Sequence, residues 1–178
     1  MDTNFEMTEG GVLMPSKLLV GGVFQGQIIR DGKVIDEFED HNLVVNEGLT
    51  SMLEIYFRSS TQITSWFLGI FEGNYTPVAS VTAATITSAS TECTAYASST
   101  RPAYSPAASS SQSLNNSASR GSFVFNATKT VYGAFLVSNS TKSATTGTLF
   151  SAARFSSAKA VESGDELLLT YTFTASSV

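Results

Sequence analysis

The sequence has 178 residues, of which 42% are hydrophobic and only 14% are charged. A chain of this length can bury roughly two-thirds of its unfolded surface in one core, so we expect a single domain. The net charge of -5 and the scattered basic residues argue against a nucleic-acid-binding surface, because phosphate binding requires clustered Lys and Arg.

The N-terminal segment, residues 1–22, is weakly patterned, and we predict an arm that precedes the domain. It is acidic where a secretion signal carries basic residues, so we expect no export signal. The apolar runs of the chain are far shorter than the ~20 residues of a membrane helix, so we expect no membrane partner. Leu13, Leu18 and Leu19 are more apolar than a solvated tail requires, which makes them candidates for contact with a neighbouring subunit. The alternative is an edge strand of the chain's own domain.

Two β-like runs, residues 23–30 and 33–39, flank an Asp31-Gly32 pair. Asp-Gly between two such runs predicts a tight hairpin, because both turn residues tolerate positive φ. Several carboxylates follow beside His41, without the ligand spacing of a calcium-binding loop. We interpret them as a solvated strand end.

After the hairpin, the spacing of the apolar residues changes to that of one helix face, which predicts a helix over residues 46–58. Asn46 occupies the N-cap position, and Glu47 suits the positive end of the helix dipole. We expect the apolar face of this helix to pack on the β-structure. That face consists of residues at the spacing of one helix side, Leu49, Met52, Leu53, Tyr56 and Phe57.

The middle of the chain contains one clear strand and one long loop. Residues 63–71 carry apolar residues on both faces, which predicts a central strand or an interface strand. Residues 85–87 are a possible strand in a weakly patterned stretch. Residues 98–120 are dominated by Ser, Ala, Pro and Asn and predict a loop, and a loop this long is a second candidate for contact between subunits.

The C-terminal third predicts four strands, at residues 122–128, 130–138, 148–155 and 166–175. In the last of these, Leu167, Leu169, Tyr171 and Phe173 alternate with mostly polar residues, as in a half-buried strand. The whole pattern predicts a mostly β fold, a β-sandwich or jelly roll spanning residues 23–178, with one short helix closing one end.

Residue chemistry favours no catalytic, cofactor or metal site. A zinc site needs three or four His and Cys ligands, whereas the chain has only His41 and Cys93. Cys93 has no partner for an internal disulfide, and we expect it to be buried. Two enzymatic alternatives remain, a Cys93–His41 pair and a glycosidase pair of carboxylates. The carboxylates considered for the latter are Glu72, Glu92, Glu162, Asp165 and Glu166.

Three residues of the predicted loops are candidates for an assembly interface. Tyr75 and Tyr104 are aromatic residues in loops, and aromatic side chains often anchor interfaces. Arg101 is isolated in a nearly uncharged region.

Five stretches resemble small virion structural proteins of tailed bacteriophages. They are NLVVNEGL at residues 42–49, SWFLGIFEGNYTP at 65–77, TRPAY at 100–104, TVYGAFLV at 130–137 and SGDELLLTYTF at 163–173. Within that group the size and the predicted all-β fold are most similar to capsid cement or decoration proteins.

This resemblance implies a non-enzymatic role on the outside of a phage capsid, after assembly in the host cytoplasm. It implies a sandwich or jelly-roll fold and a homo-oligomer, with a trimer favoured, that bridges major capsid subunits. The alternatives are a tail, adaptor or fibre-associated virion protein, or a β-sandwich that binds a glycan.

Overall fold

The computed structural model describes residues 6–8, 11–13 and 17–177, with side chains from residue 17 onward. Over this part of the chain the protein is mostly β, as predicted. The strands are β1 (Glu6–Thr8), β2 (Gly11–Leu13), β3 (Leu18–Arg30), β4 (Lys33–His41), β5 (Leu43–Val44), β6 (Trp66–Phe71), β7 (Ala103–Tyr104), β8 (Ser113–Asn115), β9 (Gly121–Val124), β10 (Lys129–Val137), β11 (Leu149–Val161) and β12 (Glu166–Ser177). The helices are α1 (Asn46–Phe57) and α2 (Ala83–Ala89).

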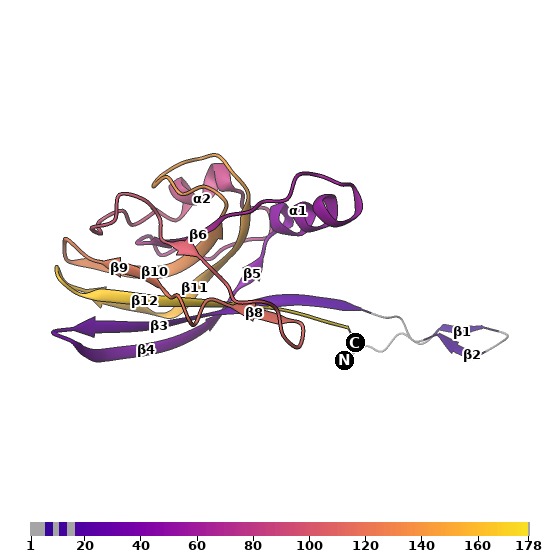
Figure 1. Ribbon diagram of the computed structural model, residues 1–178, viewed down its shortest axis with the longest axis horizontal. Coiled ribbons are helices and arrows are strands. Elements are labelled where there is room, and N and C mark those ends of the chain that lie inside the picture. The colour runs from indigo at the N-terminus through magenta and orange to yellow at the C-terminus, as the bar shows by residue number, and fades with distance from the viewer. Residues whose placement is uncertain (1–5, 9–10, 14–16, 178) are drawn as a thin grey trace.

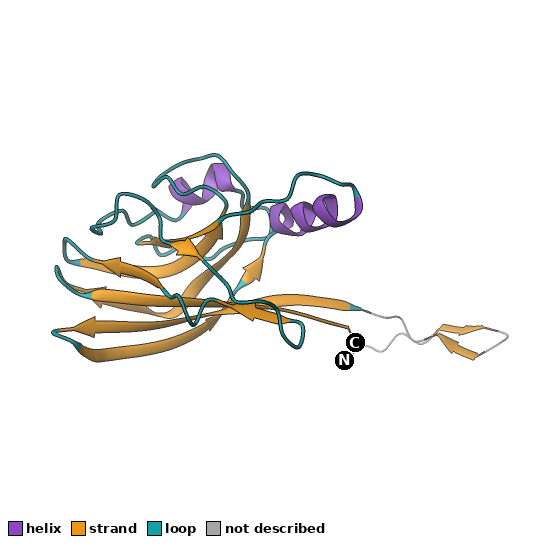
Figure 2. Cartoon of the chain, viewed as in Figure 1, coloured by secondary structure: helices purple, strands orange, loops and turns teal. Residues whose placement is uncertain are grey.

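Two antiparallel sheets pack as a β-sandwich (Figure 1). One has the strand order β5-β11-β10-β6-β7, and the other has the order β4-β3-β12-β8 with β9 also paired to β12. Figure 2 shows both helices on the side of the sandwich away from β3 and β4. The β-sandwich prediction is confirmed, and the jelly-roll connectivity stays a prediction.

The predicted hairpin joins β3 to β4. Asp31 and Gly32 both have positive φ, 50° and 73°, as this type of two-residue turn requires. Arg30 pairs with Lys33 across the turn, so the strand register follows directly from the Asp-Gly pair.

The predicted boundary of the N-terminal arm at residue 22 lies inside β3. This strand begins at Leu18 and pairs with β12 along its whole length, from Leu18 opposite Ser177 to Ile29 opposite Glu166. Residues 18–22 therefore belong to the sandwich. Within the described residues, β1 and β2 pair only with each other, and residues 1–5, 9–10 and 14–16 of the predicted arm lie outside them.

The core between the sheets follows the predicted alternation of the last strand. Leu167, Leu169 and Tyr171 are fully buried, and Phe173 is half-buried at the end of the same face. The strand predicted at residues 63–71 is β6, which lies between β10 and β7 as a central strand. Cys93 is 1% exposed in this core, as expected, and burial raises the pKa of its thiol.

Residues 85–87 belong to a helix, so the possible strand predicted there is wrong, as is the expectation of a single helix. Thr82 and Thr85 form a capping box at the start of α2, in which each side chain bonds to the backbone of the other residue. Ala83 and Ile86 are buried in a second apolar cluster, together with Val81, Phe135 and Leu149. Packing within this cluster holds α2 in place against the sheet.

The Ser-rich segment, residues 98–120, contains two short strands where the sequence predicted a loop. β7 extends the first sheet beside β6, and β8 extends the second sheet beside β12. Segment composition did not reveal them because their partners are far away in sequence. Neither helix of the described chain is long and apolar enough to cross a membrane.

Candidate assembly surface

The first turn of α1 is attached to two other elements by the carboxylate of Glu47, a residue of the helix itself. Asn46 was predicted to cap the helix, but the N-cap residue is Val45, whose side chain makes no capping bond. Val45 is fully buried, and its amide donates to the Phe150 carbonyl at 3.1 Å, so sheet pairing fixes the chain one residue earlier than predicted. The Glu47 carboxylate instead accepts from two amides of other elements, Ala83 at 2.8 Å and Leu149 at 2.7 Å.

Gly48 sets the side of α1 that faces the sandwich. It is buried, and a Cβ at this position would lie 2.4 Å from the carbonyl oxygen of Phe150. Only glycine permits this approach of helix to strand. Met52 and Ile55 follow at i+4 and i+7 on this side and are half-buried.

The opposite side of α1 carries the largest exposed aromatic side chains of the described chain. Leu53 is 59% exposed, Tyr56 84% and Phe57 75%. These three residues form what we call the α1 outer face. The sequence predicted that they pack on the β-structure, and this is wrong, because the approach at Gly48 turns them outward. Of the predicted face, only Leu49 and Met52 pack against the core.

The charges beside the α1 outer face balance. Arg58 contacts Glu54 with Nε 3.5 Å from Oε2, and both lie on one flank of the helix. The carboxylate of Glu47 is engaged with α2 and β11 instead. The outer face is therefore apolar, with one acidic and one basic side chain at its margin.

Two of the predicted interface residues lie at the same end of the molecule as α1. Leu18 is 68% exposed and Leu19 54% exposed at the start of β3. Figure 1 shows the start of β3 and α1 at one end of the long axis and the β3–β4 turn at the other. The side chain of Leu13 lies outside the described residues.

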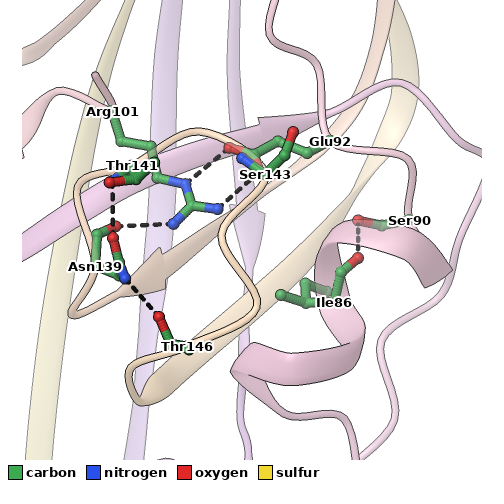
Figure 3. Close-up of polar contacts among 8 residues, drawn as sticks. All are labelled: Ile86, Ser90, Glu92, Arg101, Asn139, Thr141, Ser143 and Thr146. Atoms are coloured by element: carbon green, nitrogen blue, oxygen red, sulfur yellow. Dashed lines mark hydrogen bonds and ion pairs between the residues drawn. The ribbon is translucent and has the colours of Figure 1, made fainter. Parts of the chain in front are cut away.

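Arg101 lies inside the fold, although the sequence made it an interface candidate. Its side chain is fully buried and forms a two-pronged ion pair with Glu92, with Nε to Oε1 and Nη2 to Oε2 both 2.7 Å (Figure 3). Its third nitrogen donates to the Asn139 carbonyl at 2.8 Å, and the Ser143 amide donates to Glu92 at 2.7 Å. The pair joins three loops of the chain and is not available to a neighbour.

The two tyrosine candidates are also part of the fold. Tyr104 is 7% exposed, and its ring centre lies 5.6 Å from that of Tyr171. Burial raises the pKa of the Tyr104 hydroxyl. Tyr75 is half-buried and packs against the apolar cluster beside α2. Both were assigned to an interface because their stretches were predicted as loops. The sandwich covers Tyr104, whereas Tyr75 keeps part of its side chain exposed.

The residues considered for catalysis do not come together as a site in the described part of the chain. His41 is exposed at the end of β4, whereas Cys93 is buried in the core. Among the described residues, no group of three or more His, Cys, Asp or Glu side chains is placed to hold a metal ion. Each carboxylate considered for a glycosidase pair contacts another side chain. Glu72 contacts Lys129, Glu92 contacts Arg101, Glu162 and Asp165 both contact Arg30, and Glu166 contacts Ser122.

The outer face of the β4-β3-β12 sheet carries a polar depression of about 500 Å³. Gln25 donates to Glu39 and Gln27 donates to Glu37, in both cases across the β3–β4 pair. Arg120 in turn donates to the Gln27 side-chain oxygen. These bonds link amide, carboxylate and guanidinium groups in rows along the sheet.

A scan against protein-family models and a search of curated proteins found no match to this sequence.

Proposed function

We propose that this protein is a non-enzymatic structural component of a phage virion, which decorates the capsid and bridges its major capsid subunits. The observation that carries the proposal is the α1 outer face, an exposed apolar surface on an otherwise well-packed sandwich. The sequence resemblance to virion proteins indicates that the particle is a phage virion. The exposed α1 outer face indicates that the protein assembles with a partner.

Exposure of these side chains is costly for a protein that acts alone. Burying one large apolar side chain contributes roughly 1.5–3 kcal/mol relative to leaving it in water. Leu53, Tyr56 and Phe57 are each more than half exposed and adjacent on one helix. Exposed aromatic residues of this kind anchor protein interfaces. The α1 outer face is covered when the protein is in its assembly.

The rest of the molecule suits a role that depends on rigidity. Long strands, two apolar clusters and the buried Arg101–Glu92 pair hold the two sheets and their loops in one shape. A decoration protein works through many contacts shared between subunits, and a rigid body transmits load between them. The homo-oligomer, with a trimer favoured, and the major capsid protein as partner are part of this proposal.

The proposal is tested by co-sedimentation of the purified protein with undecorated phage heads. Wild type is expected to pellet with heads, and the variant Tyr56→Ser/Phe57→Ser is expected to lose most of this binding. Its fold should be unchanged because both side chains are exposed, which circular dichroism checks. The matched control is Val34→Ser/Ile35→Ser, which removes two side chains that are 49% and 48% exposed beside the β3–β4 turn.

Other outcomes separate the rival functions. A protein that ignores heads but pellets with tails is a tail or adaptor component instead. A glycan-binding sandwich is expected to offer an open aromatic platform for a sugar ring. The aromatic residue at the polar depression, Phe38, instead packs against Phe155 with the two rings tilted, and the Lys159 ammonium lies 4.7 Å from its ring centre.

The open aromatic rings of the described chain are Tyr56 and Phe57 on the α1 outer face. Loss of sugar binding, rather than of head binding, in Tyr56→Ser/Phe57→Ser would favour the glycan-binding alternative. The sequence resemblance to virion proteins places capsid decoration first.

A further inference from the structure

We infer that the open edge of β3 at Leu18 and Val20 pairs with the same edge of a second copy of this chain. The two strands run antiparallel and are related by a two-fold axis at Leu19. The inference rests on the proposed assembly role and names a contact through which two copies meet.

The first strand of the second sheet, β3, continues past the end of its neighbour β4 (Figure 1). Where β4 ends, the Asn42 amide donates to the Gly22 carbonyl at 3.0 Å. The backbone groups of alternate residues point to the same edge of a strand. Those of Val20 and Leu18 therefore point to the edge that Gly22 uses, away from β12. Among the described residues, none bonds to this edge beyond Gly22.

This open edge also lacks charge. Unpaired N–H and C=O groups along an edge are a template for another strand, and proteins commonly prevent such pairing with charged side chains. The edge strand β4 carries such charges, at Lys33, Asp36, Glu37, Glu39 and Asp40. The start of β3, LLVGG at residues 18–22, carries none. The chemistry of the edge therefore suits an extended strand as its partner.

The edge complements itself in one register. When Leu19 lies opposite Leu19 of the partner subunit, Leu18 lies opposite Val20 of the partner subunit, and each such pair can exchange two hydrogen bonds. Both unpaired residues of both copies are then bonded, as an isologous contact requires. Shifting one strand by two residues places Leu18 opposite Gly22, whose carbonyl already accepts from Asn42, or leaves Val20 beyond the end of the partner strand.

The side chains at this edge also suit the pairing. Leu18 is 68% exposed and Leu19 54% exposed. Side chains directly opposite in an antiparallel pair contact each other, so both leucines gain an apolar neighbour. Lys17, exposed just before the strand, is brought toward the end of β4 in the other copy. Because the chain has a net charge of -5, this basic residue is attracted to the other copy.

A proline at position 20 tests the backbone pairing. Val20→Pro removes an amide that points to the open edge, and proline is tolerated where the amide of an edge strand faces solvent. Light scattering of the free protein over a range of concentrations is expected to show Val20→Pro at half the mass of wild type. This holds whether wild type has two copies or has six because a separate contact builds trimers. Circular dichroism checks that the fold is unchanged.

Glu39→Pro is the matched control. By the same alternation, the Glu39 amide points to the outer edge of β4, away from β3. This variant is expected to keep the mass of wild type, because the inferred contact does not include β4.

A cysteine at the two-fold axis provides an independent measurement. In the inferred register the two positions 19 form a pair without hydrogen bonds between them, with Cα atoms about 4.5 Å apart. A disulfide forms at such a separation. Leu19→Cys is therefore expected to give a covalent dimer under mild oxidation. Val34→Cys, at an exposed position beside the β3–β4 turn, is not, and the native Cys93 is buried.

Two results overturn the inference. One is an equal mass for wild type and Val20→Pro, and the other is a lack of cross-linking at Leu19→Cys. Because no heads are used, these results are independent of the sedimentation test of the proposed function.

Discussion

At the residue scale, Arg101 shows how a charged side chain in a polar loop becomes part of the core. Its isolation in a Ser-rich segment resembled that of an exposed contact, whereas its partner Glu92 lies nine residues earlier beside a different loop. Its guanidinium group donates hydrogen bonds to the Glu92 carboxylate and to the Asn139 carbonyl. The guanidinium carbon lies 5.3 Å from the ring centre of Phe135. The pair specifies how three loops meet.

Replacing Arg101 by Met is expected to destabilise the protein strongly. The substitution leaves Glu92 buried without a counter-charge, and breaking a buried ion pair in this way costs about 3–5 kcal/mol. Urea denaturation at pH 7 measures the loss.

Two further variants test this explanation. Glu92→Met/Arg101→Met removes both charges and should recover part of the loss, because no buried charge remains. Arg120→Met, at an exposed arginine, should stay within about 0.5 kcal/mol of wild type. Equal losses for Arg101→Met and Arg120→Met would show that the buried pair contributes little.

At the element scale, α1 combines a correctly predicted helix with an incorrectly predicted orientation. The apolar period located the helix within one residue at each end, Asn46–Phe57 against 46–58. Period alone does not say which neighbour an apolar stripe meets, because a stripe that faces a partner has the same spacing as one that faces the core. The orientation depends on Gly48, where the absence of a side chain lets the helix approach the Phe150 carbonyl.

Gly48→Ala is expected to destabilise the protein although alanine favours helices. The intrinsic gain is about 1 kcal/mol, but the new methyl group would lie 2.4 Å from the Phe150 carbonyl oxygen, and rigid backbone cannot yield cheaply. Overpacking of this kind typically costs about 1–3 kcal/mol, which offsets or exceeds that gain. Thermal unfolding checks the sign, with Gly21→Ala as control because a methyl group there meets nothing within 4 Å. A stabilised Gly48→Ala variant would show that α1 can move away from β11.

At the scale of the whole molecule, an ion pair joins the end of β3 to the turn between β11 and β12, where the chain passes from one sheet to the other. Arg30, at the end of β3, donates to both oxygens of Asp165 at 2.8 and 2.7 Å. The Asp165 side chain is 3% exposed, and its second oxygen also accepts from the Glu162 amide. The Arg30 guanidinium lowers the pKa of Asp165 below its ordinary value.

The stability gained from Asp165 is expected to depend on pH. Because its folded pKa is lowered, its ionised form stabilises the fold above the unfolded pKa near 4, and this gain is lost as pH falls through the folded pKa. Arg30→Met should therefore be less stable than wild type at pH 7, with a gap that narrows below about pH 4. Urea denaturation of both proteins between pH 7 and pH 2.5 measures the gap, with Glu162→Gln as a control for the more exposed contact of Arg30. A gap that is constant with pH would show that the ion pair is not its source.

The sequence by itself determined the features that depend on neighbouring residues. The Asp31-Gly32 hairpin, the alternation of β12 and the existence of α1 all follow from turn chemistry or from periods of two and 3.6 residues, which are local properties. The mostly β class followed from the number of such strands.

Only the tertiary structure decided the features that depend on residues distant in the chain. It covered Arg101 and Tyr104, formed β7 and β8 within the Ser-rich segment, and turned Leu53, Tyr56 and Phe57 outward. Each of these outcomes depends on a partner more than a local period away, such as Tyr171 for Tyr104 or Phe150 for Gly48. The candidate surface was therefore not predictable from spacing, because the sequence shows that a helix has an apolar face but not what that face meets.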